Sequence, residues 1–270
     1  LVYTPPTGTV LSAGSQTLSV TFTPTDPANY SSATKIVTIG VGRVMPEITW
    51  SNPADIGYGT ALGSAQLNAA VAGNVAGTLV YTPPSGTVLN AGSQSLSVTF
   101  SATDVANYSG VTKAVAINVG KATPVITWSP PADIVYGTAL GQAQLNAAVA
   151  GSVAGTLVYT PPSGSVLNAG SQTLSVTFTP TDTADYTSVT KTIGINVGKA
   201  TLVITWSPPA DIVYGTALGA VQLNAAVAGN VDGTLVYTPP SGTVLNAGSQ
   251  KLNVTFTPTD AANFSSVTTV

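Results

Sequence analysis

The chain has 270 residues, only 6% of them are charged, and its formal net charge is −3. So few cations leave no basic surface to neutralise phosphates, and we expect no nucleic-acid partner. The chain has no His and no Cys. It therefore lacks disulfides, thiolate nucleophiles, Cys-ligated zinc and the commonest general base. The composition argues against an enzyme, and we expect neither a metal nor another cofactor.

Hydrophobic residues make up 44% of the chain, but they occur in short runs. Gly, Pro, Asn or Thr interrupts each run well before the roughly 18–20 apolar residues that cross a bilayer. We expect no membrane insertion within this sequence. The first residues, Leu1–Pro6, also lack the basic start and apolar core of a signal peptide.

The sequence repeats with a period of about 78 residues. The motif Tyr-Thr-Pro-Pro begins at Tyr3, Tyr81, Tyr159 and Tyr237. A unit of this length can hold a small core of its own, so we expect a tandem array of modules. The expected modules are 1–42 (the C-terminal part of one), 43–120, 121–198, and 199–270 (lacking most of its last strand).

Within a module, apolar and polar residues alternate with a period of two, which is typical of half-buried β-strands. Gly, Pro and Asn turns separate the alternating runs. The alanine-rich run 143–150 is compatible with a short helix, but its alternation and flanking glycines favour a strand. In chain order, strands are expected near 124–129, 134–136, 143–149, 156–160, 165–168, 173–179 and 190–197. Strands this short and this closely spaced predict an all-β fold of antiparallel β-sandwiches.

The ordered motifs of one unit, Ile-Thr-Trp, Asp-Ile-x-Tyr-Gly-Thr-Ala-Leu, Gln-Leu-Asn-Ala and Leu-Val-Tyr-Thr-Pro-Pro-Ser-Gly, continue into Leu-Ser-Val-Thr-Phe-Thr-Pro-Thr-Asp-x-Ala-Asn-Tyr. They run, for example, from Ile126 to Tyr186, with Asp185 in the Asn place. This order resembles bacterial immunoglobulin-like domain repeats along the whole chain. The resemblance implies Ig-like sandwiches in a large bacterial surface or secreted protein, with no catalytic residues. The Cys-Trp-Cys frame of antibody domains is missing.

Each complete module carries two recurring aspartates, such as Asp133 and Asp182. A pair of carboxylates serves acid–base catalysis in some enzymes and calcium binding in other proteins. No Asp-x-Asp-x-Asp cluster occurs, and both residues stand in turn sequences, so we expect them to close Asx turns. The motif Asp-x-Ala-Asn-Tyr is expected in the loop of the last hairpin.

The recurring aromatic residues offer a second candidate site. We expect Trp50, Trp128 and Trp206 in the cores, because a small domain must bury its largest side chains. The tyrosines of the Tyr-Gly-Thr motif either join the core or face a ligand such as a sugar. The candidate ligand-facing residues are Tyr58, Tyr136 and Tyr214.

These observations predict a non-enzymatic spacer or stalk, extracellular or at the cell surface, that supports adhesion. The alternative is an array of modules that bind carbohydrate or protein by avidity. Each module has its neighbours in the chain as partners. The incomplete modules 1–42 and 199–270 leave strands unpaired, and Thr34–Val41 is a strand that another chain can accept. We therefore also expect self-association through the two ends.

Overall fold

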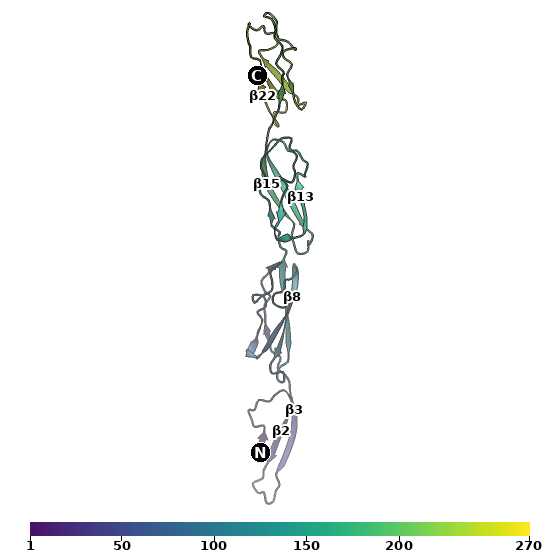
Figure 1. The fold of residues 1–270 in the computed structure, drawn as a ribbon. Helices are drawn as coiled ribbons and strands as arrows, with labels where there is room; N and C mark the ends of the chain where they lie inside the picture. The colour runs from purple at the N-terminus through teal and green to yellow at the C-terminus, as the bar shows by residue number, and fades with distance from the viewer. The chain divides into compact units, whose positions relative to one another are not determined.

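The computed structural model describes all 270 residues, and its fold is all-β (Figure 1). The Cα positions divide the chain into two compact units. Unit 1 comprises Leu1–Ala122 and Ala184–Tyr186, and unit 2 comprises Thr123–Thr183 and Thr187–Val270. No helix in the structure is long and apolar enough to span a bilayer.

Unit 1 contains a three-stranded sheet in the order β1-β2-β3, a two-stranded sheet β4-β6, and a four-stranded sheet β5-β9-β8-β7. Its elements are β1 (Val2–Thr4), β2 (Gly14–Phe22), β3 (Ala33–Val41), β4 (Ile48–Thr49), β5 (Ile56–Gly57), β6 (Ala70–Val71), the 3₁₀ turn η1 (Ala72–Asn74), β7 (Gly77–Thr82), β8 (Gly92–Ala102) and β9 (Val111–Gly120).

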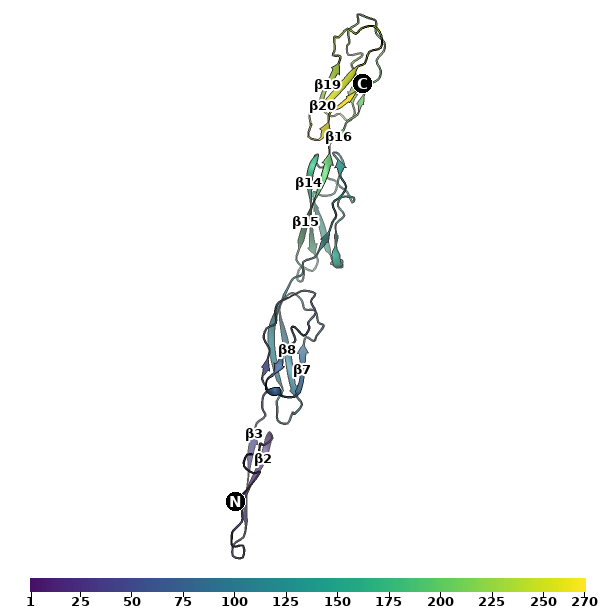
Figure 2. The same cartoon turned by 90° about the vertical axis from the view of Figure 1, so that its left-hand side faces the viewer.

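Unit 2 repeats the same arrangement over 123–198, with sheets β10-β12 and β11-β15-β14-β13, and then has the smaller sheets β17-β18, β19-β20-β22 and β16-β21. Figure 2 shows β14 and β15 side by side. The elements are β10 (Ile126–Thr127), β11 (Ile134–Val135), β12 (Ala148–Val149), η2 (Ala150–Ser152), β13 (Gly155–Thr160), β14 (Gly170–Pro180), β15 (Val189–Gly198), β16 (Ala200–Thr201), β17 (Ile204–Thr205), β18 (Ala226–Val227), β19 (Gly233–Thr238), β20 (Asn253–Pro258), β21 (Phe264–Ser265) and β22 (Val267–Thr269).

Alternation decides which side chains enter the core. In β14, Leu174, Val176 and Phe178 are almost completely buried, and the hydroxyl residues between them face the other side of the sheet. The two-stranded sheet covers this apolar face with Ile126 and Trp128. A separate cluster of the equivalent residues lies within 43–120, built around Leu96, Val98 and Phe100, with Ile48 and Trp50 opposite them.

The sheets are not purely antiparallel, contrary to the prediction. β11 runs parallel to β15, pairing Ile134 with Val197, and β5 runs parallel to β9 in the same way. Pro130 and Pro131 lie between β10 and β11. Because proline cannot donate to a ladder, the chain leaves the first sheet there and adds to the free edge of the second without reversing.

The expected strand at 143–149 is wrong except for its last two residues. Gln144 and Leu145 form a turn, in which both backbone N–H groups donate to the carbonyl of Gly141. The side chain of Gln144 accepts a hydrogen bond from the N–H of Gly141 at 3.1 Å, which holds the turn closed. The expected strand at 165–168 is reduced to one bridge, between Ala139 and Val166.

Candidate functional site

The three tyrosines proposed to face a ligand lie in two different environments. Tyr58 and Tyr136 are half-buried, whereas Tyr214 is 73% exposed. The ring of Tyr136 makes an edge-on contact with Phe264, with ring centroids 5.2 Å apart. Tyr58 makes the same contact with Tyr186, also at 5.2 Å. In both cases the partner belongs to the Asp-x-Ala-Asn-Tyr motif of a later period of the sequence.

This motif forms the loop of the last hairpin, as predicted. In the loop that follows β8, Asp104 Oδ1 accepts the backbone N–H groups of Ala106 and Asn107, both at 3.1 Å, which is an Asx turn. Asn107 Nδ2 donates to Asp104 Oδ2 at 2.8 Å. This side-chain hydrogen bond, together with the two backbone ones, lowers the pKa of Asp104 below its ordinary value of 3.8. The Asp thus shapes the loop, and the Asn oxygen is left to bind elsewhere.

In unit 2 this oxygen binds the preceding period of the sequence. Asn263, which is buried, accepts the backbone N–H of Ala169 at 2.8 Å. Its own carbonyl accepts the N–H of Ala200, which starts the parallel pairing of β16 with β21. Lys199 Nζ donates to the carbonyl of Ala261 at 2.6 Å. The bond to Ala169 and the ring contact of Tyr136 fasten 199–270 to the end of 121–198. The bonds of Lys199 and Ala200 hold the start of 199–270 against its own last hairpin loop, and we call the whole set a joint.

Unit 1 contains the hydrogen bonds of this joint, without the ring contact, between 1–42 and 43–120. Asn107 Oδ1 accepts the backbone N–H of Ala13 at 2.7 Å. Val44 donates its N–H to the carbonyl of Asn107 and accepts from Ser109, both at 2.9 Å.

Within unit 1, Asp185 makes the hydrogen bond that Asn107 and Asn263 make in the two joints, with a carboxylate oxygen in place of an amide oxygen. Asp185 Oδ1 accepts the N–H of Ala91 at 2.6 Å, and the side chain is 6% exposed. A buried N–H requires an acceptor, and every residue at this position supplies an oxygen two bonds from Cβ. These residues are Asn107, Asp185 and Asn263. In each case the side-chain oxygen binds a backbone N–H of the preceding period.

The other recurring aspartates do not close the turns expected of them. Asp133 Oδ2 accepts Asn196 Nδ2 at 3.3 Å, and Asp55 accepts Asn118 in the same way. Each bond ties the segment before the Tyr-Gly-Thr motif to the last strand of its sheet. No group of three or more Asp or Glu residues gathers where it would hold a metal ion.

Two of the three tryptophans lie in the core, as predicted, whereas Trp206 is half-buried and lines a cavity. Trp50 and Trp128 are buried, and the indole N–H of Trp128 donates to the carbonyl of Gln144 at 3.1 Å. The ring of Tyr159 packs edge-on against Trp128, and the hydroxyl of Tyr159 accepts the N–H of Ala147. The polar groups of Trp128 and Tyr159 therefore both have hydrogen-bond partners inside the fold.

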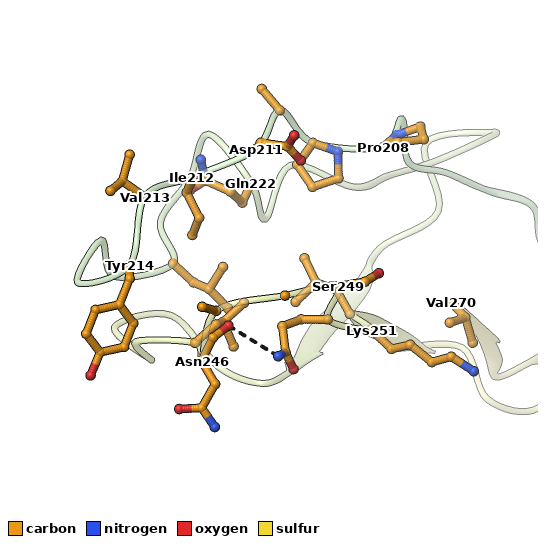
Figure 3. Close-up of a pocket in the computed structure, with 18 of the residues that line it drawn as sticks. Pro208, Asp211, Ile212, Val213, Tyr214, Gln222, Asn246, Ser249, Lys251 and Val270 are labelled. Atoms are coloured by element: carbon orange, nitrogen blue, oxygen red, sulfur yellow. Dashed lines mark hydrogen bonds between the residues drawn. The ribbon is translucent and has the colours of Figure 1, made fainter.

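One cavity of about 760 Å³ lies in 199–270 (Figure 3). One wall runs from Trp206 to Tyr214, and the facing wall runs from Leu245 to Leu252. Val270 lies at one end of the cavity. In the two preceding periods the last strands, β9 and β15, pair with the residues equivalent to this second wall.

No protein-family model matches the chain, and no curated protein matches it.

Proposed function

We propose that the chain is a non-enzymatic spacer or stalk, a tandem array of Ig-like sandwiches of about 78 residues in a bacterial cell-surface or secreted protein that supports adhesion. The joint is the observation that carries this proposal. A spacer has to keep successive modules at a defined separation and orientation. A buried hydrogen bond and an edge-on aromatic contact join the two modules, and a parallel strand pair holds the residues after the linker against the same loop. Together they restrict bending far more than a bare linker does.

The chemistry of the side chains supports a structural role. The chain has 10 acidic residues and neither His nor Cys. The recurring carboxylates, in the positions of Asp104 and Asp133, are occupied by hydrogen bonds from asparagine side chains. A catalytic carboxylate needs a neighbour that pushes its pKa toward the working pH. At Asp104 the neighbour lowers the pKa instead.

The alternative is an array that binds carbohydrate or protein by avidity. The exposed ring of Tyr214 favours it, since a sugar stacks on an open aromatic face. The equivalent rings of Tyr58 and Tyr136 are covered at their joints. An avidity mechanism needs the same open site in several modules, so the spacer is the better account.

Spin labels at Val158 and Val236, exposed equivalents in β13 and β19, test the spacer directly. A spacer requires a narrow distribution of distances between them, which broadens in the double variant Asn263→Ala, Phe264→Ala. The same double change at Asn29 and Tyr30, where the loop contacts no other module, is the matched control. A distribution as broad in the unchanged protein as in the joint variant contradicts the proposal.

Two further measurements separate the spacer from its alternative. A glycan array probed with the whole chain should give no hits, and reproducible hits lost in Tyr214→Ala would favour the binding array. Antibody labelling of intact bacterial cells that produce the natural protein tests its extracellular location. Label found only after cell lysis contradicts that part of the proposal.

A further inference from the structure

One edge of the four-stranded sheet in 121–198 is open. In the order β11-β15-β14-β13, β13 is the last strand and pairs only with β14 (Figure 1). The N–H of Thr181 donates to the carbonyl of Ala154, and this register directs the backbone groups of the even-numbered residues of β13 toward β14. The backbone N–H and C=O groups of Leu157 and Tyr159 therefore point outward, where no strand pairs with them.

The two edges of this sheet differ in how well they exclude another strand. β11, at the other edge, has only two residues, and Asp133 comes directly before it. Short edge strands and charged side chains are common protections of a sheet edge. β13 has six residues and pairs along its whole length without a bulge, and no charged residue occurs from 134 to 181. The edge at β13 therefore lacks these protections and can accept another strand.

The side chains on the outer face of β13 match a second copy of the same strand. Val158 is 61% exposed and lies between Thr156 and Thr160 on that face. An antiparallel pair with its two-fold axis at Val158 places this valine opposite Val158 of the second copy, and Thr156 opposite Thr160 of the second copy. In the same register the outward backbone groups of Leu157 exchange hydrogen bonds with those of Tyr159 of the second copy. The strand is therefore complementary to itself in backbone, shape and charge.

We propose that this edge binds the same edge of a second copy of the chain, so that the two sheets continue as one across an isologous contact. β7 shares this property, because it has the same six residues, no charged residue occurs from 56 to 103, and Val80 is 62% exposed. The pairing satisfies the outward backbone groups and covers β-branched side chains, which form favourable cross-strand pairs. β19 also has these six residues, but Asp232 directly precedes it and places a charge beside its edge. We expect β19 to pair less than β7 and β13.

This pairing does not depend on the spacer function, because each edge lies within one module. The spin labels of the spacer test occupy Val158 and Val236, so labelled chain is diluted there into an excess of unlabelled chain, which leaves only distances within one chain. A chain that does not associate therefore leaves the spacer function standing. A broad distance distribution likewise leaves the edge pairing standing.

Sedimentation velocity of the whole chain at about 5–500 μM tests the association. We expect species larger than the 26.9 kDa monomer, and their share should increase with concentration. The double variant Val80→Glu, Val158→Glu places like charges opposite each other and should weaken association roughly tenfold or more. Val88→Glu, Val166→Glu is the matched control, because these valines are 47% and 51% exposed but lie outside β7 and β13. A monomer at every concentration, or equal weakening by both double variants, overturns the proposal.

Single cysteines locate the contact, since the chain has no Cys of its own. Val158→Cys chains should form disulfide-linked dimers, because the two-fold axis brings the Cα atoms of this position to about 4.5 Å, within disulfide reach. Thr156→Cys, on the same face of the same strand, is the matched control and should not cross-link alone. An equal mixture of Thr156→Cys chains and Thr160→Cys chains should cross-link, because the register places these positions opposite each other. Equal cross-linking of Val158→Cys and Thr156→Cys, or no cross-linking in the mixture, overturns the proposal.

Discussion

Replacing Asn263 with alanine tests whether the joint depends on one side-chain oxygen. The change removes the acceptor of the Ala169 N–H, which lies 2.8 Å away in a part-buried position. It also removes the bond from Asn263 Nδ2 to Asp260 Oδ2, 2.8 Å long, which is internal to the loop. The backbone carbonyl of residue 263, which accepts from Ala200, remains.

The size of the effect follows from the burial of the donor. A buried N–H that loses its acceptor costs about 1–3 kcal/mol. If opening of the joint controls exchange of the Ala169 amide, that cost accelerates exchange by about 5- to 150-fold. The fold of each sheet should hold, because neither core cluster includes Asn263.

Amide hydrogen exchange followed by NMR gives this measurement one residue at a time. The Ala13 amide, held by Asn107 in unit 1, serves as a reference in the same molecule and should not change. Asn29→Ala is the matched control, because Asn29 also donates to its loop aspartate at 2.8 Å but joins no other module. An unchanged rate at Ala169, or an equal increase in Asn29→Ala, would refute the account of the joint.

Three further changes test other parts of the structure. Leu174→Ala should destabilise its sheet by about 2–5 kcal/mol, and Leu252→Ala, beside the cavity, by much less; equal losses in denaturation followed on amides of β14 and β20 would contradict this. Asn107→Ala should raise the pKa of Asp104 toward 3.8, because it removes the largest cause of the lowering. In the unchanged protein the ionised Asp104 stabilises the loop above pH 3.8, and this stabilisation is lost as the pH falls through the lowered pKa. A carboxyl NMR titration measures the pKa, and the same midpoint in both proteins would contradict the prediction. Gly155→Ala should destabilise by about 1–3 kcal/mol, because a Cβ would overlap a carbonyl and a phenyl ring of β14; a neutral result in urea denaturation would contradict it.

The long strands were predictable because one local signal determines them. Strict alternation over 173–179 and 190–197 places large apolar residues on one face, and β14 and β15 cover these runs. At 143–149 the alternating residues are mostly alanine and asparagine, which carry little preference for either face. There a glutamine side chain closes a turn, and the buried Leu145 enters the core from that turn.

The joint was not predictable from one module, because its atoms lie far apart in sequence. Asn107 and Ala13 are 94 residues apart, as are Asn263 and Ala169. One signal was nevertheless present. The Asx turn needs only the aspartate that begins the motif Asp-x-Ala-Asn-Tyr. The fourth residue of the motif nevertheless always carries a side-chain oxygen that can accept a hydrogen bond. That position is Asn29, Asn107, Asp185 and Asn263.

Exposure of an aromatic ring therefore has a different meaning in an array than in a single domain. Tyr214 is exposed and its equivalent Tyr136 is half-buried, although the sequences around them are almost identical. The difference comes from Phe264, which packs on Tyr136 and belongs to the next period. The exposure of such a ring depends on whether the aromatic residue of the next period packs against it. It becomes an argument for a ligand site only when the ring stays open beside a docked neighbour, and Tyr136 does not.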